Sequence, residues 1–154
     1  MISDIEARIA ALDTAYHRLL LIVGETRSGK TAVMKDLAQR LAAPLVNVNL
    51  RFSRDLLDIP LQRRPFRASE LLEEIVQPSS DRVTLLDNIE LLFDPELKQD
   101  PLRLLQLLSR RGTLVVSWPG SMVGTSLVYA EPGHPEYRRY ERPEVAIVKL
   151  PDPD

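Results

Sequence analysis

The feature that most constrains this chain is an eight-residue loop, Gly24-Glu25-Thr26-Arg27-Ser28-Gly29-Lys30-Thr31, which matches the pattern G-x-x-x-x-G-K-[ST] in full. The glycines of such a loop let the backbone curl so that successive N–H groups point at phosphate oxygens. We expect Lys30 to reach the β- and γ-phosphates and Thr31 to offer its hydroxyl to Mg²⁺. An apolar run precedes the loop and an amphipathic segment follows it, which is the strand-loop-helix context that phosphate binding requires.

The rest of the chain alternates between predicted strands and predicted helices. Strands are expected at residues 19–23, 45–50, 82–87, 113–118 and 144–150, and helices at 1–17, 29–41, 53–57, 68–76 and 101–110. Strands joined through helices form right-handed crossovers and a parallel sheet with helices on both faces. The sequence therefore predicts a single α/β domain over residues 1–154, a three-layer P-loop NTPase fold with a mostly parallel sheet of about five strands.

Residues 119–142 interrupt this alternation. Where another crossover helix is expected, the chain has three prolines, three glycines and one short apolar stretch at 127–129. We expect an irregular insertion with room for one extra strand or hairpin, and its length indicates a functional role. For Trp118, just before the insertion, packing is favoured over a role in a contact surface. The same choice holds for the apolar cluster at 89–93, where core packing is favoured over docking of a partner.

A second motif lies downstream of the loop, where the strand expected at 82–87 ends in Asp87. An apolar strand with a terminal Asp, after a complete phosphate loop, is typical of a Walker B strand, and we expect Asp87 beside the first strand, where it would hold Mg²⁺ directly or through water. In AAA+ and related ATPases the next residue is usually Glu, the base that activates water, but here it is Asn88. Asn can orient water and cannot take its proton, so Glu90 is the nearest candidate base, unless it only caps the next segment.

Ser117 and several arginine pairs are further candidates for nucleotide contacts. Ser117 ends the strand at 113–118, a place where many ATPases carry a polar residue that senses the γ-phosphate, although a small polar residue is ordinary there. The pairs at 110–111 and 138–139 are candidate arginine fingers for a neighbouring subunit. Together with the pair at 63–64 they could instead contact a nucleic-acid backbone or remain solvated, and no regular aromatic spacing indicates base recognition.

Composition removes several classes of function. The 20 basic and 22 acidic residues nearly cancel, so no overall field draws the chain to nucleic acid or to an anionic membrane. The absence of cysteine excludes disulfides, thiolate catalysis and thiolate metal sites, and two histidines cannot form a metal site alone. We expect no signal peptide and no membrane span, so a cytoplasmic location is the default. A chain of 154 residues also leaves no room for the C-terminal helical lid of AAA+ ATPases.

Three stretches, together with the short chain and the phosphate loop near its N-terminus, resemble one family. They are LLDNIELLFDPEL at 85–97, DPLRLLQ at 100–106 and YAEPGHPEY at 129–137. The chain is similar to BrxF, the small P-loop protein of type 3 BREX bacteriophage-exclusion systems. This resemblance implies a cytoplasmic bacterial defence component that acts beside a large ATPase, a DNA methyltransferase, an alkaline-phosphatase-like protein and a helicase.

The sequence favours an accessory subunit that binds ATP with Mg²⁺, hydrolyses it weakly, and controls assembly with partner proteins or with copies of itself. One alternative is a small-molecule phosphotransferase, with an acceptor site near Asp55 and Asp58; its lid would have to come from the proline-rich insertion, which does not favour a helix. Another is a scaffold that binds nucleotide without hydrolysis, for which Asn88 is the main argument. No guanine-reading N-K-x-D motif is present, which favours ATP over GTP.

Overall fold

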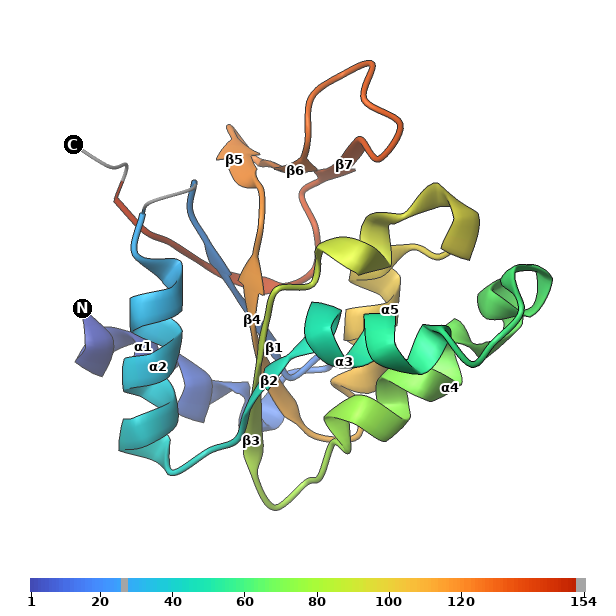
Figure 1. Cartoon of the computed structure of the whole chain (residues 1–154). Coiled ribbons are helices and arrows are strands. Elements are labelled where there is room, and N and C mark those ends of the chain that lie inside the picture. The colour runs from blue at the N-terminus through green and yellow to red at the C-terminus, as the bar shows by residue number, and fades with distance from the viewer. Residues whose placement is uncertain (26–27, 152–154) are drawn as a thin grey trace.

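The computed structural model describes residues 1–25 and 28–151, which form a three-layer α/β fold (Figure 1). Five parallel strands form the central sheet in the order β2-β3-β4-β1-β8. They are β1 (Leu19–Val23), β2 (Leu45–Asn47), β3 (Val83–Asp87), β4 (Thr113–Trp118) and β8 (Ala146–Lys149). The α/β class and the mostly parallel five-stranded sheet expected from the sequence are confirmed.

The strand order corrects one expectation about Asp87. This residue ends β3, and β3 pairs with β4, which in turn pairs with β1. Asp87 therefore does not lie beside the first strand, because β4 intervenes. All of these strands are parallel, so their carboxyl ends meet at one edge of the sheet, and Asp87 still reaches the loop that follows β1.

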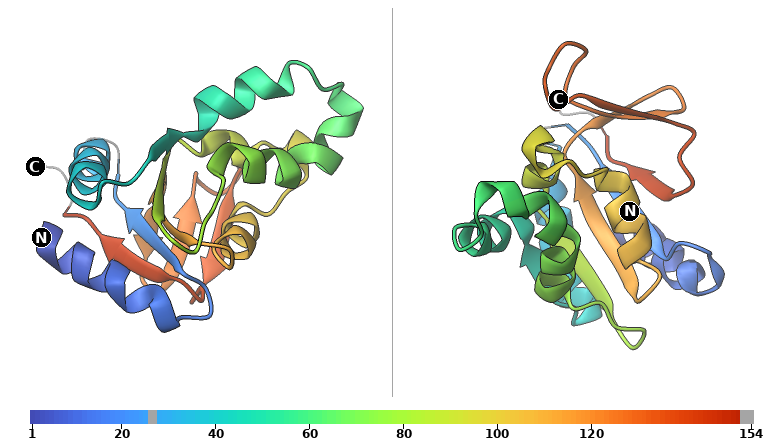
Figure 2. Two further views of the ribbon diagram at one scale, coloured as in Figure 1. Left: turned by 90° about the horizontal axis from the view of Figure 1, so that it is seen from below. Right: turned by 90° about the vertical axis from the view of Figure 1, so that its right-hand side faces the viewer.

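Helices cover both faces of the sheet, as Figure 1 and the left view of Figure 2 show. One face is covered by α1 (Ile2–Ala10) and α2 (Lys30–Leu41), and the other by α3 (Val48–Leu56), α4 (Arg64–Val76) and α5 (Pro101–Leu108). Within β1, Leu20 and Ile22 pack toward α1 and α2, whereas Leu19, Leu21 and Val23 join the core on the other face. A strand buried on both faces needs an uninterrupted apolar run, which is why this segment is readable in the sequence.

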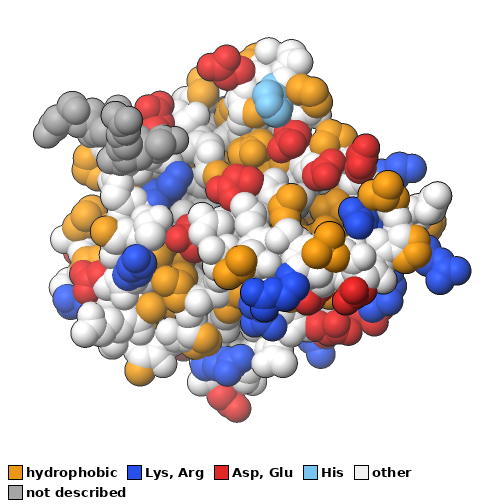
Figure 3. All heavy atoms as spheres, in the orientation of Figure 1, with side chains coloured by type: hydrophobic (Ala, Val, Ile, Leu, Met, Phe, Trp, Pro, Cys, Tyr) orange, Lys and Arg blue, Asp and Glu red, His pale blue; other side chains and the backbone are white. Residues whose placement is uncertain are grey.

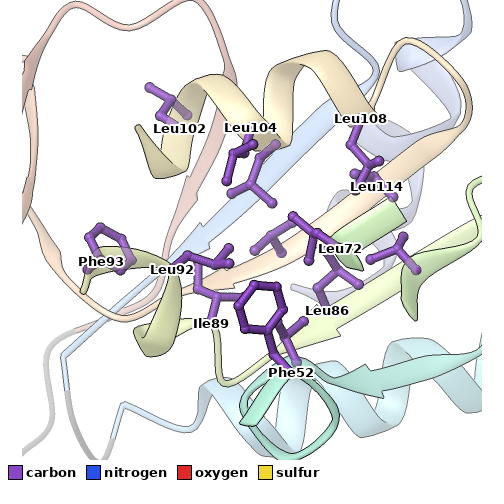
Figure 4. Packing of buried hydrophobic residues seen from close by; sticks show 14 of the residues in the cluster. Phe52, Leu72, Leu86, Ile89, Leu92, Phe93, Leu102, Leu104, Leu108 and Leu114 are labelled. Atoms are coloured by element: carbon purple, nitrogen blue, oxygen red, sulfur yellow. The ribbon is translucent and has the colours of Figure 1, made fainter. Parts of the chain in front are cut away.

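The core beneath α3, α4 and α5 includes the apolar cluster that follows β3. Figure 4 shows Ile89, Leu92 and Phe93 packed among side chains from α3 to α5 and the sheet, and all three are buried. The expectation of core packing for this cluster is therefore confirmed. Most of the cluster forms the short 3-10 helix η3 (Glu90–Phe93), and a second 3-10 helix, η4 (Pro95–Leu97), follows it.

The second strand is shorter than expected, because a helix begins where we predicted its second half. Asn47 ends β2 and caps α3, its side chain accepting a hydrogen bond from the Leu50 N–H at 3.1 Å. Val48, Phe52 and Leu56, spaced four residues apart, form the buried face of α3. The alternating apolar residues of 45–50 suggested a strand, but the helical spacing of the apolar residues from 48 to 56 determines the structure from Val48 onward.

Several element bounds also differ from the predicted ones. The N-terminal segment, expected as one helix over 1–17, forms α1 with Met1 as its N-cap, followed by a 3-10 helix, η1 (Ala11–Thr14). The helical pieces expected at 53–57 and 68–76 lie in the longer helices α3 and α4, which are joined through η2 (Leu61–Arg63). Helix α5 begins at Pro101, as predicted, and Asp100 caps it by accepting a hydrogen bond from the Arg103 N–H. No helix among the described residues is long and apolar enough to cross a bilayer.

The insertion at 119–142 is more regular than expected. It forms a three-stranded antiparallel sheet of β5 (Ser121–Val123), β6 (Ser126–Tyr129) and β7 (Arg138–Glu141), which lies above the carboxyl edge of the central sheet (Figure 1). The buried Trp118 donates a hydrogen bond from Nε1 to the Val128 carbonyl at 3.1 Å and so attaches this small sheet to β4. A Cβ at Gly120 would lie 1.8 Å from the same carbonyl oxygen, so only glycine permits this close approach.

Candidate functional site

The loop that links β1 to α2 has the backbone features of a phosphate cradle. A Cβ at Gly24 would lie 2.4 Å from Ser28 Oγ, and Gly29 has a φ of +90°, so neither position accepts another residue without strain. Gly29 is also the N-cap of α2, so the amino end of this helix opens directly behind the loop. Thr26 and Arg27, which complete the predicted loop, lie outside the described residues.

Lys30 lies between neutral and acidic partners at the base of the loop. Its Nζ donates hydrogen bonds to the carbonyl oxygens of Gly24 and Trp118, the latter at 3.1 Å. Burial lowers the pKa of Lys30, while the charges of Glu90 and Asp87 act in the opposite direction. A partly desolvated ammonium held by two neutral carbonyls would gain from an anionic phosphate partner, because charge-assisted hydrogen bonds are the stronger ones.

Thr31 and Asp87 bring two oxygen donors together. The Thr31 hydroxyl donates to Asp87 Oδ2 at 3.3 Å, and the Asn88 N–H donates to Asp87 Oδ1 at 3.0 Å. Hydroxyl and carboxylate oxygens are the ligands that Mg²⁺ prefers, and this ion usually takes its remaining ligands from water and substrate phosphates. The pair therefore fits a Mg²⁺ site that a bound nucleotide would complete.

A cavity of ≈ 470 Å³ opens at the carboxyl edge of the sheet, where these residues meet. Its lining residues are Glu25, Gly29, Lys30, Thr31, Ala32, Asp87, Asn88, Glu90, Ser117, Pro119 and Tyr129. Apart from Gly24, Ser28 and the two loop residues outside the described part of the chain, every residue that we expected to contact nucleotide or metal lies on this wall. The volume is that of a small-molecule site, and crevices outside the carboxyl ends of parallel strands are where α/β folds bind ligands.

Glu90 is held on the cavity wall by a residue that the sequence analysis missed. The Asn49 backbone N–H donates to the Asn88 carbonyl at 2.8 Å, and its side-chain oxygen accepts from the Leu91 N–H at 2.8 Å. The side-chain amide of Asn49 also donates to Glu90 Oε2. One residue in the first turn of α3 thus fixes the backbone on both sides of Glu90 and orients its carboxylate. Glu90 is the first residue of η3, and within the described part of the chain the N-cap residue of that helix, Ile89, makes no side-chain cap hydrogen bond.

Asn88 turns the chain at the end of β3. Its φ of 54° lies in the left-handed region, which Asn adopts more readily than most residues other than glycine. The strand therefore ends at Asp87, and the 3-10 helix η3 begins three residues later, at Glu90. Asn88 lines the cavity together with Glu90, so an amide and a carboxylate both lie on its wall.

Tyr129 brings the insertion to the cavity, which the sequence did not indicate. Its ring stacks on Phe93, with 3.7 Å between ring centroids, and its hydroxyl donates to Glu136 Oε1 at 3.5 Å. Burial, with further contributions from the charges of Glu136 and Glu90, raises the pKa of Tyr129 to about 12. A neutral phenol therefore lines the cavity at ordinary pH. Only the apolar stretch at 127–129 marked this segment in the sequence.

The cavity wall is rich in negative charge. Of the residues that the structure describes there, three carry carboxylates (Glu25, Asp87 and Glu90), and only Lys30 carries a positive charge. A nucleotide triphosphate adds more negative charge, so its binding calls for Mg²⁺ and favours a further cation.

The candidate arginine fingers have other partners within the chain. The Arg110 guanidinium lies over the Tyr16 ring, 4.9 Å from its centroid, and Arg111 pairs with Glu73. Both arginines precede β4 and so lie at the opposite end of the sheet from the cavity. In β7, Arg138 donates to the Gln99 carbonyl at 2.6 Å, and Arg139 is 3.6 Å from Glu141. An arginine finger for this cavity therefore stays a prediction that depends on another molecule.

The features expected of a phosphotransferase are not brought to the cavity. In the described part of the chain, neither Asp55 nor Asp58 lies on its wall. The insertion forms an antiparallel sheet, so over residues 119–142 the structure contains no lid helix.

Comparison with solved structures shows a likeness of fold. The structure is similar to that of C. elegans PCH-2, with a TM-score of 0.47 and 17% sequence identity. The match covers 99% of this chain and 42% of the PCH-2 chain, so the present chain spans less than half the length of that protein. No protein family model matches the sequence.

Proposed function

We propose that this chain is a nucleotide-binding accessory subunit that holds ATP with Mg²⁺ in the cavity at the carboxyl edge of its sheet. The observation that carries the proposal is the convergence of Lys30, the Thr31–Asp87 pair and Glu90 on one cavity behind a glycine-constrained loop. In the chain these residues are spread over 61 positions, from 30 to 90. Their meeting at one ligand-sized site is what a Mg²⁺-nucleotide requires.

Each residue has a distinct role in this proposal. The loop N–H groups and Lys30 would bind the phosphates, and Thr31 with Asp87 would hold Mg²⁺, which draws charge from the phosphate oxygens. Glu90, oriented by Asn49, is the group placed to accept a proton from an attacking water. Ser117, buried at the end of β4, would contact the phosphate end of the ligand.

Intrinsic hydrolysis is expected to be slow. The cavity supplies one positive side chain against three carboxylates, so charge that develops on the phosphates is poorly neutralised without help from outside. Stimulation by a partner that donates an arginine would follow from this imbalance. If the native chain hydrolyses ATP no faster than the buffer alone and Glu90→Gln changes nothing, the chain is a nucleotide-binding scaffold and not an ATPase; measurable hydrolysis that Glu90→Gln leaves unchanged would show that Glu90 is not the base.

The biological part of the proposal is a role in a bacterial anti-phage system of the BREX type. It is supported by the likeness of 85–97, 100–106 and 129–137 to BrxF, which also suggests a cytoplasmic location. The proposed partners are other defence proteins, including a large ATPase, or copies of the same chain. Direct contact with nucleic acid has little support, because the net charge is -2. Neighbouring genes that encode a BREX system would support this role, and a gene context without defence genes would contradict it.

The binding test compares Lys30→Ala with Lys35→Ala, because both residues lie on α2 and only Lys30 lines the cavity. We expect Lys30→Ala to weaken ATP binding by about 100-fold, as loss of a charge-assisted contact predicts, and Lys35→Ala to leave it unchanged. Fluorescence anisotropy with a labelled ATP analogue measures both. Pull-down of the partner proteins with and without ATP then tests control of assembly, which would be refuted by identical recovery in the two conditions.

A further inference from the structure

Helix α4 and its N-cap residue carry a charged stripe along their exposed face, formed by Arg63, Arg67, Glu70 and Glu74 and followed by the C-cap residue Gln77. These residues follow one another at spacings of three or four, so they lie on one side of the helix. The amino-terminal half of the stripe is basic and the carboxyl-terminal half is acidic. Figure 3 shows blue and red side chains side by side at the lower right of the molecule, where Figure 1 places α4.

This order of charges does not stabilise α4 within a single chain. The amino end of a helix dipole is positive and favours acidic residues, and the carboxyl end favours basic ones. The first turn of α4 contains no acidic residue and its last turn no basic residue. Even the pair within the stripe, Arg67 and Glu70 at 3.5 Å, has its basic member first, which is the weaker orientation. An external partner with the opposite charge order would explain the stripe.

Exposed apolar side chains adjoin the basic half of the stripe. Leu57, Leu61 and Phe66, at the connection from α3 to α4, are 79%, 62% and 85% exposed. In the left view of Figure 2 this connection projects away from the sheet. Beside the acidic half lies a groove between α4 and α5, whose lining is four leucines (Leu72, Leu104, Leu107 and Leu108) together with Ser69, Glu73 and Arg111. Each end of the stripe thus combines a charge with an apolar surface, and the two ends are complementary.

We propose that α4 pairs with α4 of a second copy of this chain in an antiparallel dimer with two-fold symmetry. When two copies of a helix lie antiparallel, residues equidistant from the crossing point face each other. With the crossing between Ala68 and Ser69, Arg67 faces Glu70 of the second copy, and Arg63 faces Glu74. Symmetry repeats both pairs, and Phe66 of each copy meets the α4–α5 groove of the other. Two-fold dimers bury the same patch on both subunits, which a self-complementary stripe satisfies.

The neighbouring charges that face α4 are already paired within the chain and leave the stripe available. Glu73 pairs with Arg111, and Arg64 donates to the Ile59 carbonyl at 2.9 Å. The stripe also lies outside the cavity wall at the carboxyl edge of the sheet. The dimer is therefore independent of nucleotide binding, and its failure would leave the proposed function standing.

Two charge-reversal variants of the full chain test the pairing. Arg63→Glu/Arg67→Glu makes the stripe wholly acidic, and Glu70→Arg/Glu74→Arg makes it wholly basic. Sedimentation velocity without nucleotide, up to a concentration on the order of 100 µM, should show a dimer for the native chain. Each variant alone should dissociate at least about tenfold more readily, because like charges then face each other four times. An equimolar mixture of the two should restore the dimer.

Two controls keep the result interpretable. Lys35→Glu/Lys149→Glu changes the net charge by the same amount as the acidic variant, but on α2 and β8, and should leave the dimer intact. Phe66→Ser should weaken it without reversing any charge. A native chain that stays monomeric, a dimer that resists both reversals, or folded variants whose mixture does not associate would each overturn the proposal. In the first case the stripe would serve a different protein or a nucleic acid.

Discussion

Two segments border the same cavity and are built in opposite ways. The loop at 24–31 is a local structure, fixed by its own glycines between a strand and the helix that follows at once. The antiparallel sheet β5-β6-β7 is placed by contacts distant in sequence. Besides the Trp118–Val128 bond, Arg138 donates to the Gln99 carbonyl at 2.6 Å, and the Tyr140 hydroxyl donates to Asp100 Oδ1 at 2.7 Å.

Trp118 belongs to both segments and shows how they are connected. Its backbone carbonyl accepts a hydrogen bond from Lys30, and its indole N–H donates to Val128 in β6. Its ring also meets Phe93 edge-on, 5.2 Å between centroids, and Phe93 stacks on Tyr129. A ligand that draws Lys30 away from Trp118 would therefore act directly on the residue that anchors the insertion. The loop thus depends on local sequence for its geometry, whereas the insertion's side of the cavity depends on contacts that only the complete fold provides.

The largest expected effect is on the attachment of the insertion. Gly120→Ala would place a Cβ 1.8 Å from the Val128 carbonyl oxygen, and backbone atoms must shift to relieve this overlap. We expect a loss of about 3 kcal/mol in the free energy of unfolding, at the upper end of overpacking costs. Gly133→Ala is the control in the same insertion, because a Cβ there meets nothing within 4 Å. The only cost is that alanine disfavours the φ of +94° at this position, so the free energy of unfolding should fall by about 1 kcal/mol. Denaturant unfolding of both variants checks the difference, and equal losses would contradict this account of the anchor.

Substitution of two nearby asparagines, Asn49 and Asn47, distinguishes an effect on hydrolysis from an effect on stability. Asn49→Ala removes both side-chain bonds to the Glu90 segment, so we expect hydrolysis to fall about tenfold while ATP affinity stays unchanged. Asn47→Ala removes the cap of α3 and should cost about 1 kcal/mol of stability with no effect on hydrolysis. Steady-state phosphate release and thermal unfolding measure the two effects. If both variants lose hydrolysis equally, Asn49 has no specific part in positioning Glu90.

A smaller effect is expected where the insertion meets the ligand. Tyr129→Ala removes the aromatic wall of the cavity and should weaken ATP binding by about fivefold, the scale of one aromatic contact. Tyr129→Phe keeps the stack on Phe93 and should bind nearly as the native chain does. Tyr137→Ala, also in the insertion, is the control. Unchanged affinity in Tyr129→Ala would show that the insertion does not contact the nucleotide.

The smallest expected effect is on the alkaline titration of Tyr129. Its pKa is raised to about 12 from an ordinary value of 10.0, so the folded chain holds this proton more tightly than the unfolded chain. The stability that this group contributes is complete below pH 10 and is lost as the pH rises toward 12. The difference in ultraviolet absorbance between the native chain and Tyr129→Phe should have its midpoint near 12. A midpoint near 10 would mean that the phenol is not buried as described.

The same contrast explains what the sequence could reveal. The strand predicted at 19–23 coincides with β1, and the helix predicted at 29–41 differs from α2 by one residue, because apolar runs and glycines act locally. Asp87, Glu90 and Ser117 could be proposed because each stands at or near a strand end. How close they lie to the loop depends on the order of strands in the sheet, which local sequence patterns do not encode. The prediction that β3 lies beside β1 was wrong, because β4 lies between them.

The insertion and Asn49 could not be inferred in this way. Antiparallel pairing of β6 with β7 depends on residues on either side of a long turn, and prolines there indicated irregularity. Asn49 contacts Glu90 across 41 positions, and its place was obscured by apolar alternation that suggested a strand at 45–50. In both segments, contacts between residues distant in sequence override the structure that the local sequence pattern indicates.

The central claim is that the cavity between the loop and the insertion binds ATP together with Mg²⁺. Isothermal titration calorimetry of the native chain with ATP, in Mg²⁺ and then in EDTA, tests it most directly. We predict one site per chain, with an affinity in Mg²⁺ at least about tenfold higher than in EDTA, because Thr31 and Asp87 are proposed to hold the metal and not the nucleotide. No binding, or equal affinity in the two conditions, would contradict the account.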